Sequence, residues 1–150
     1  MEKRNVLFVM SSLRNGGAER SLVNLLQLLD YDRYNVDLLL FQNEGMFLKQ
    51  VPKAVNIISN CNKLYTLYDN NKAEALKHPY LSAVHMIGTF ISRKKTNSVA
   101  KSRQYRWEHF YKKIVPELTK EYDVAIAYMQ REQTYFLVDK VKATKKIAWV

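Results

Sequence analysis

The sequence predicts an α/β domain: a Rossmann-like three-layer αβα sandwich with a mostly parallel sheet of about five or more strands. The first observation is a set of short, nearly continuous apolar runs, which are typical of strands covered on both faces. The second is that segments with apolar residues at three- and four-residue spacing separate these runs. Strands that alternate with helices indicate a parallel sheet. At 150 residues, of which 47% are hydrophobic, the chain is long enough to bury one core.

The first part of the chain follows a β-α-β-α-β pattern. Asn5–Met10 is almost entirely apolar and predicts a buried strand, and residues 11–17 form a turn. Ala18–Leu29 predicts an amphipathic helix because its leucines recur on one side. A strand, a short helix and another strand are then predicted at Val36–Phe41, Met46–Gln50 and Val55–Ile58.

A helical insert is predicted from about Lys72 to Lys120, where no strand pattern occurs. It holds two helical patterns separated by residues 94–97, and the wide apolar face of Tyr80–Ile91 predicts a helix covered on more than one side. A strand, a helix and a fifth strand follow at Val124–Tyr128, Glu132–Val141 and Lys146–Val150. The chain ends before the loop that would follow this last strand. Since such loops carry ligand contacts in α/β sheets, we expect the sequence to be part of a longer protein.

The charge balance favours anionic partners. The chain has 24 Lys and Arg against 14 Asp and Glu, a net charge of +10, which suits nucleic acid, an anionic membrane face or phosphorylated small molecules. Nucleic acid is not expected, because no zinc-ligand spacing, helix-turn-helix or RNA-recognition signature is present.

Apolar runs and cysteine usage indicate a cytoplasmic protein. No run reaches the roughly 18 residues that cross a bilayer, and Val6–Met10 is too short for a secretion signal. The lone Cys61 cannot form an intramolecular disulfide and is expected to pack at a strand end. Some of the protein could still lie at the inner face of the membrane.

That possibility comes from residues 93–113, which contain eight basic residues and one acidic residue, Glu108. A helical wheel places an apolar side opposite a basic side, with Arg103 at the apolar edge. The apolar side holds Val99, Trp107, Phe110, Tyr111, Ile114 and Leu118. The basic side holds Lys101, Arg106, His109, Lys112 and Lys113. Such a helix either contacts an anionic membrane or packs on the core with an ordinary solvated face.

A glycine turn, Asn15-Gly16-Gly17, lies between the first strand and the first helix. Backbone amides at a helix N-terminus favour anions, so the turn could bind a phosphate or diphosphate; it could also be simply a tight βα turn. It is not a P-loop, because no Lys-Ser or Lys-Thr follows at the required spacing. It lacks the third glycine of the dinucleotide fingerprint, where Ser21 and Leu22 stand.

The wider context resembles a known family. The strand Val6–Met10, followed by the run Gly16-Gly17-Ala18-Glu19-Arg20 and the helix to Leu25, is similar to the start of glycosyltransferase family 4 enzymes, which are retaining enzymes of the GT-B fold. Tyr122–Ala127 and Lys146–Val150 resemble the fourth and fifth strands of the same domain.

The resemblance implies that residues 1–150 are the N-terminal, acceptor-side Rossmann-like domain of a hexosyltransferase of cell-envelope or polysaccharide biosynthesis. The glycine loop would close over the diphosphate of a nucleotide-sugar donor held by a C-terminal donor-binding domain, which this chain lacks. The acceptor would be a glycan or a lipid-linked glycan. The catalytic histidine of many relatives would fall just after Val150, so this part alone would be inactive and would bind no cofactor. The alternative is a stand-alone α/β module that binds an anionic ligand without catalysis.

The candidate site follows from the expected strand order 3-2-1-4-5, which reverses between strands one and four. Loops 11–20 and 129–133 flank that point. Their arginines either bind phosphate, which suits them because the guanidinium donates two hydrogen bonds at once, or are ordinary solvated side chains. The candidate binding residues are Arg14, Gly16, Gly17, Ala18, Arg20, Gln130 and Arg131. Glu19 is expected to be stabilised by the helix dipole. No metal site is expected, and His78, His85 and His109 are expected at the surface.

Overall fold

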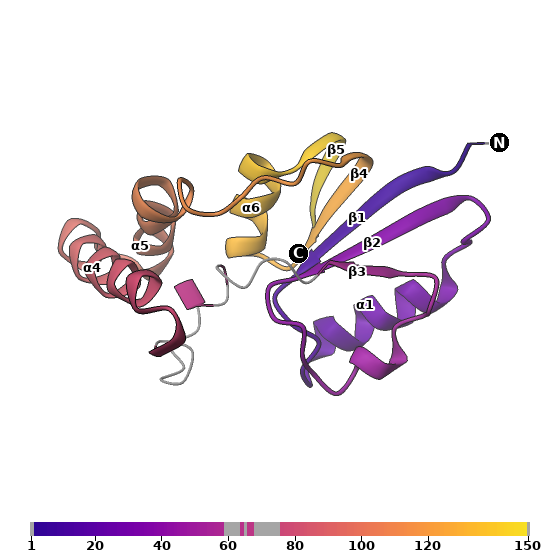
Figure 1. Cartoon of the computed structure of the whole chain (residues 1–150), viewed down its shortest axis with the longest axis horizontal. Helices are drawn as coiled ribbons and strands as arrows, with labels where there is room; N and C mark the ends of the chain where they lie inside the picture. The colour runs from indigo at the N-terminus through magenta and orange to yellow at the C-terminus, as the bar shows by residue number, and fades with distance from the viewer. Residues whose placement is uncertain (1, 59–63, 65, 68–75, 150) are drawn as a thin grey trace. The chain divides into compact units, whose positions relative to one another are not determined.

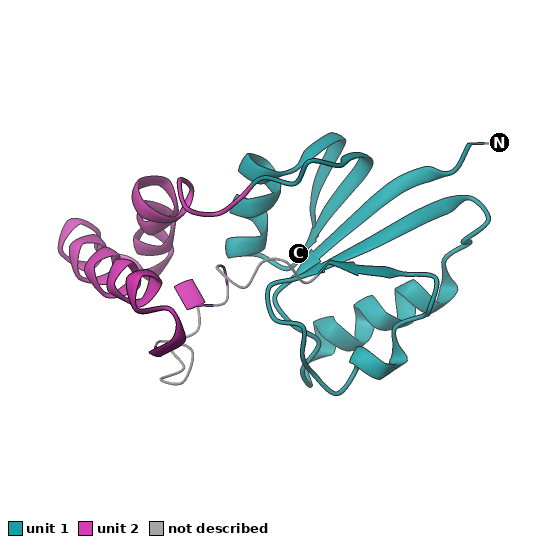
Figure 2. Cartoon of the chain, in the orientation of Figure 1, with its two compact units in different colours: residues 1–60, 117–150 teal, residues 61–116 magenta. Residues whose placement is uncertain are grey.

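The computed structural model describes residues 2–58, 64, 66, 67 and 76–149 (Figure 1). The chain divides into two compact units, residues 1–60 with 117–150 and residues 61–116 (Figure 2). We call them unit 1 and unit 2 and describe each by itself. The expectations for Cys61, for Lys72 at the start of the insert and for Val150 lie outside the described residues.

Unit 1 contains a five-stranded, all-parallel sheet in the order β3-β2-β1-β4-β5. The predicted fold class and strand order are therefore confirmed. The strands are β1 (Arg4–Met10), β2 (Tyr34–Leu40), β3 (Asn56–Ile58), β4 (Glu121–Tyr128) and β5 (Lys142–Trp149). The order reverses between β1 and β4, which pair directly, with Val6 opposite Val124.

Helices lie on both faces of this sheet, as the Rossmann-like sandwich requires. They are α1 (Gly17–Leu28), the 3₁₀ helix η1 (Leu48–Gln50) and α6 (Glu132–Lys140). Alternating side chains of β1 point to opposite faces: Phe8 joins the core cluster that α1 covers, and Leu7, fully buried, faces the other way. On that second face Phe136 of α6 meets Phe41 edge to face, with ring centroids 5.8 Å apart.

Several element boundaries differ from the predictions, each for a local reason. β4 begins at Glu121 rather than Val124, and β5 begins at Lys142 rather than Lys146. Almost every residue of β5 is exposed because it forms an edge of the sheet, so its first half carries no apolar run. The short helix predicted at Met46–Gln50 is a single 3₁₀ turn.

One buried charge joins three strands of unit 1. The carboxylate of Asp37 on β2 accepts hydrogen bonds from Lys120 Nζ (2.8 Å), Tyr122 Oη (2.7 Å) and Asn56 Nδ2 (3.0 Å). Burial alone would raise the pKa of Asp37, but these hydrogen bonds and the Lys120 charge lower it overall. Burial, and then the bond to Asp37, raise the pKa of Tyr122 well above its ordinary value. The carboxylate is held charged by its donors.

Unit 2 is helical where it is described, as predicted for the insert. Its named elements are α4 (Pro79–Lys95), α5 (Val99–Arg106) and the π-helical turn η2 (Trp107–Tyr111). α4 and α5 meet at small residues: Ser92 and Ser102 are buried, and their hydroxyls lie 2.8 Å apart. None of the described helices is long and apolar enough to cross a membrane.

The π turn overturns part of the predicted helical wheel. The residues buried in this segment are Ser102, Trp107, Tyr111 and Val115. The spacing from Ser102 to Trp107 is five residues rather than four, so the buried face of the helix shifts by one residue at the π turn. The helical part ends at Tyr111, so Leu118, predicted on the apolar side of the wheel, lies beyond it, and its amide donates to Lys140 O.

Two further wheel assignments are wrong, and so is one histidine placement. Val99, expected on the apolar side, is 70% exposed, whereas Arg106, expected on the basic side, is half-buried. His85, expected at the surface, is also half-buried, and its Nδ1 lies 2.6 Å from Leu67 O and 3.2 Å from Tyr111 Oη. Desolvation lowers the pKa of His85 below its ordinary value. The hydrogen bond to Leu67 opposes this change, and the nearby charges of Arg106 and Arg93 add to it.

Candidate functional site

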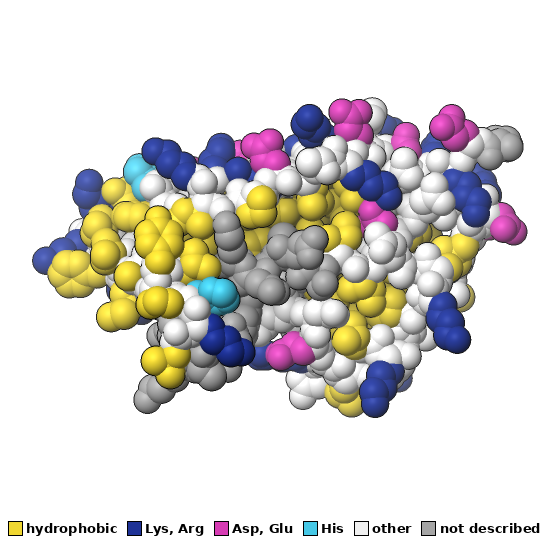
Figure 3. All heavy atoms as spheres, in the orientation of Figure 1, with side chains coloured by type: hydrophobic (Ala, Val, Ile, Leu, Met, Phe, Trp, Pro, Cys, Tyr) yellow, Lys and Arg dark blue, Asp and Glu magenta, His cyan; other side chains and the backbone are white. Residues whose placement is uncertain are grey.

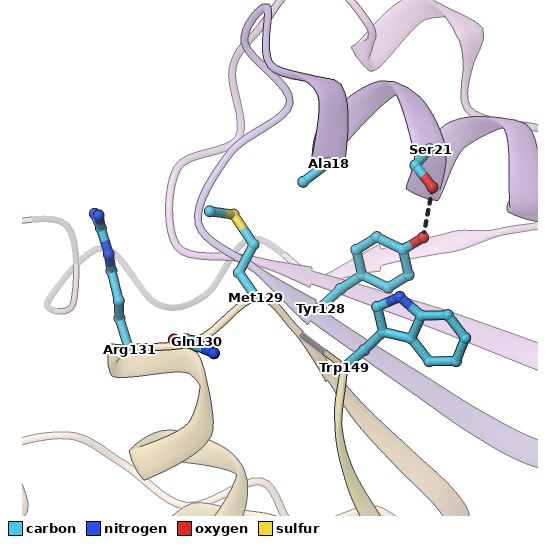
Figure 4. A pocket seen from close by; sticks show the side chains of 7 residues that line it. All are labelled: Ala18, Ser21, Tyr128, Met129, Gln130, Arg131 and Trp149. Carbon is cyan, nitrogen blue, oxygen red and sulfur yellow. Dashed lines mark hydrogen bonds between the residues drawn. The ribbon is translucent and has the colours of Figure 1, made fainter.

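A cavity of about 390 Å³ in unit 1 lies beside the N-terminal turns of α1, at the carboxyl ends of β4 and β5 (Figure 4). This is the side of the sheet, next to the reversal between β1 and β4, where α/β folds bind ligands. The lining residues come from α1, from β4 and the turn after it, and from the end of β5. They are Ala18, Ser21, Tyr128, Met129, Gln130, Arg131 and Trp149.

Two stacked aromatic rings form one wall of this cavity. Strand register places Tyr128 opposite Trp149, and their rings are nearly parallel (5°) with centroids 6.1 Å apart. Phe8 supports Tyr128 from the core through an edge contact at 6.4 Å. Tyr128 is buried, whereas Trp149 is 59% exposed. The wall thus has a fixed inner ring and an accessible outer ring.

Polar groups surround these rings. Ser21 Oγ lies 2.9 Å from Tyr128 Oη, so α1 and β4 are joined at the cavity, as the dashed line in Figure 4 shows. Met129 points toward the start of α1, and Arg131 stands at the start of α6 (Figure 4). Gln130 and Arg131 are exposed and able to donate hydrogen bonds to a ligand.

The backbone is strained at the same place. Met129 has φ 150° and Arg131 has φ 109°, and these are the non-glycine residues with positive φ in the described part of the chain. Such conformations cost about 1–3 kcal/mol each and cluster at functional sites. Here they turn the chain sharply between β4 and α6 and leave Gln130 and Arg131 beside the cavity.

The glycine turn has an open side. Gly16 caps α1 with extended backbone (φ −94°, ψ 165°), and a Cβ built there would overlap the Glu19 carboxylate. A Cβ on Gly17 would meet no atom within 4 Å. Glycine is therefore not required at position 17 by the fold, and the space in front of its backbone is free for a ligand to approach.

The structure brings together some of the predicted site residues. Ala18, Gln130 and Arg131 line the cavity, and the two glycines directly precede Ala18. Arg14 and Arg20 do not line it: Arg20 is exposed on α1, and Arg14 donates from Nε to Glu44 Oε1 at 2.7 Å. Four further residues line the cavity and were not predicted as site residues: Ser21, Tyr128, Met129 and Trp149. Tyr128 and Trp149 are aromatic residues at the carboxyl ends of predicted strands, where ligands bind in α/β folds, and this pattern could have identified them.

The described lining offers hydrogen-bonding groups and an accessible aromatic ring. No lining residue is a carboxylate or a histidine, so a general base at ordinary pH is missing from the described wall. The described residues also hold no cluster of three or more His, Cys, Asp or Glu able to bind a metal ion. Stacked rings with hydroxyl, amide and guanidinium groups around them can bind a sugar ring or a planar base through its faces and its edges.

Comparisons with known proteins provide no family assignment. No family model matches the chain, and neither the curated proteins nor the solved structures contain a match.

Proposed function

We propose that this chain is the acceptor-side domain of a retaining GT-B glycosyltransferase. In this proposal the enzyme transfers a sugar from a nucleotide-sugar donor to a glycan or lipid-linked acceptor in the cytoplasm. A C-terminal domain would supply the donor site and the catalytic groups. Unit 1 would bind the acceptor in the cavity beside α1 and close its glycine turn over the donor diphosphate.

The observation that carries the proposal is where this cavity lies and what lines it. The run from Gly16 to Arg20, which carries the family resemblance, starts the helix that forms one side of the cavity. Trp149, which is 59% exposed and backed by the buried Tyr128 ring, provides a ring face of the kind that sugars stack on.

Calorimetry tests this division of labour. We expect glycosides that mimic an acceptor to bind residues 1–150, and the same chain to show little heat with uridine and guanosine sugar diphosphates. Trp149→Ala should abolish glycoside binding, whereas Leu28→Ala, an exposed site at the far end of α1, should leave it unchanged. Micromolar binding of a sugar nucleotide by this chain would contradict the proposed placement of the donor site.

The alternative is a stand-alone module that binds an anionic ligand at the same cavity. Arg131 and the open approach to Gly17 would serve that role equally well. The coding sequence beyond Val150 separates the two proposals. A second nucleotide-binding domain supports the transferase, and a stop codon directly after Val150 supports the module.

We also propose a peripheral contact between unit 2 and an anionic membrane, made by α4 rather than through residues 93–113 as the sequence suggested. Trp107 and Tyr111 are buried and unable to enter lipid. The exposed apolar residues lie on α4 instead: Ile87 is 55% exposed and Phe90 62%. Lys94 lies over the Phe90 ring at 4.5 Å, so charge and apolar surface adjoin, and Figure 3 shows apolar side chains beside basic ones over these helices.

A further inference from the structure

Unit 2 contains a second cavity, separate from the candidate site of unit 1. It has a volume of about 400 Å³ and lies where α4 ends and α5 begins. Its lining consists of three arginines, three hydroxyl residues, an asparagine and a valine: Arg93, Arg103, Arg106, Thr96, Ser98, Ser102, Asn97 and Val99. The described lining residues of this cavity include no carboxylate.

Arg106 shows that the positive charge of the cavity is incompletely satisfied. Its Nη1 donates a long hydrogen bond of 3.4 Å to Thr89 Oγ1, and its buried Nε has no hydrogen-bond partner among the described residues. Leaving a buried donor of a charged group unpaired is costly, and each such group in a native fold calls for a cause. The stem of the Arg106 side chain packs against α4, since a Cβ built on Gly88 would lie 3.7 Å from Arg106 Cγ.

Arg93 adds a second charge that is available to a ligand. It is exposed, and no hydrogen bond or ion pair to it is found among the described residues. Its field and that of Arg106 both reach His85, where they help to lower the pKa of the ring. Two guanidinium groups from different helices thus create a positive potential over the same part of unit 2.

Helix α5 contributes its N-terminus to the same wall. Ser98 caps the helix by accepting a hydrogen bond from the Lys101 amide at 3.2 Å. The amides of the first helical residues have no acceptor within the helix, and they carry the positive end of its dipole. Val99, the first residue of α5, lines the cavity.

We propose that this cavity is a binding site for a phosphoryl group, held by the forks of Arg93 and Arg106 and by the N-terminus of α5. A tetrahedral dianion suits this arrangement because a guanidinium can donate two parallel hydrogen bonds to it. A remaining oxygen can face the hydroxyl of Ser98, which accepts from the Lys101 amide and keeps its own proton to donate. The phosphoryl group comes either from a soluble phosphomonoester or from a phospholipid headgroup. The site does not depend on the function proposed for unit 1.

The test measures binding of inorganic phosphate to the full 150-residue chain by calorimetry, and binding to phosphatidylcholine vesicles with and without phosphatidic acid by flotation. The main variant is Arg93→Gln, whose exposed position makes a folding defect unexpected. Lys113→Gln is the matched control, because it removes one charge from the same unit at an exposed residue outside the cavity. Arg106→Lys keeps the charge but loses the planar fork.

Loss of one charge-assisted contact should weaken phosphate binding by about tenfold or more in Arg93→Gln and Arg106→Lys, and by less than about twofold in Lys113→Gln. Phosphate binding with this pattern supports a soluble phosphomonoester. Flotation that requires phosphatidic acid and Arg93, without binding of free phosphate, supports a lipid headgroup. If neither probe binds, or if Lys113→Gln weakens binding as much as Arg93→Gln, the proposed site is refuted.

Discussion

Replacing Gly17 separates the folding role of the glycine turn from its proposed role in binding. A Cβ at this position meets no atom within 4 Å, so Gly17→Val introduces no clash in the chain itself. Gly17 begins α1 and its φ is not positive, so a side chain is also compatible with the backbone. We expect the free energy of unfolding to change by no more than about 0.5 kcal/mol, as at an ordinary surface position. Thermal denaturation should therefore show a shift in Tm of no more than about 2 °C.

The effect on transfer should be much larger. If the amides at the start of α1 approach a diphosphate, the valine side chain occupies the space that the ligand needs. Losing one or two hydrogen bonds to a charged group costs about 1.5–3 kcal/mol, which is about 10- to 150-fold in kcat/KM. The assay is sugar transfer by the protein that contains both domains, with Gly17→Ala as a smaller step and Asn24→Val, exposed further along α1, as the control. A Gly17→Val enzyme that folds and transfers normally would refute the role of this loop.

Three other predictions follow from the contacts described. Tyr122→Phe removes a donor from buried Asp37 and should lower the free energy of unfolding, measured in urea, by about 1.5–3 kcal/mol. Tyr34→Phe is the control and should leave the free energy of unfolding almost unchanged, because the Tyr34 hydroxyl has no hydrogen bond among the described residues. Because folding lowers the pKa of Asp37, its stabilisation is complete above the unfolded value of about 3.9 and is lost as the pH falls below it. The wild-type protein should therefore lose stability in acid, and Asp37→Asn should show a flatter pH profile. If α4 enters anionic membranes, Phe90→Ser should reduce the recovery of protein with anionic vesicles in a flotation assay at physiological salt. Val138→Ser, at an exposed position on α6, is the control and should reduce recovery less. Equal recovery of the two variants would exclude lipid insertion by α4.

Much of unit 1 was predictable because its strands obey a simple rule. β1 and the apolar part of β2 are buried on both faces, and such strands read as continuous apolar runs. Edge strand β5 does not follow the rule, since its exposed residues carry no apolar run and its first half was missed. The order of the strands was expected from the fold class, because a Rossmann-like sheet has the order 3-2-1-4-5, and the structure has this order.

The contents of the candidate site were harder to predict than its position. Local sequence identified the turns that flank the reversal, but Tyr128 and Trp149 meet only through the pairing of β4 with β5. Ser21 joins them through a contact 107 residues away in the chain. In unit 2, the π turn at Trp107 shifted the helical phase, and a wheel drawn at constant pitch then placed Arg106 on the wrong side.

The most direct test of the central proposal, that the cavity beside α1 binds the acceptor, is a two-dimensional ¹H–¹⁵N NMR titration of residues 1–150 with acceptor-like glycosides. The stacked wall and strained turn predict shifts of the Ala18 and Ser21 amides, of the Met129–Arg131 amides and of the Trp149 indole. The indole of Trp107, buried in unit 2, should not move. Saturable shifts confined to the first set are the predicted result. Shifts centred on unit 2, or none at millimolar glycoside, would contradict the assignment of the cavity as the acceptor site.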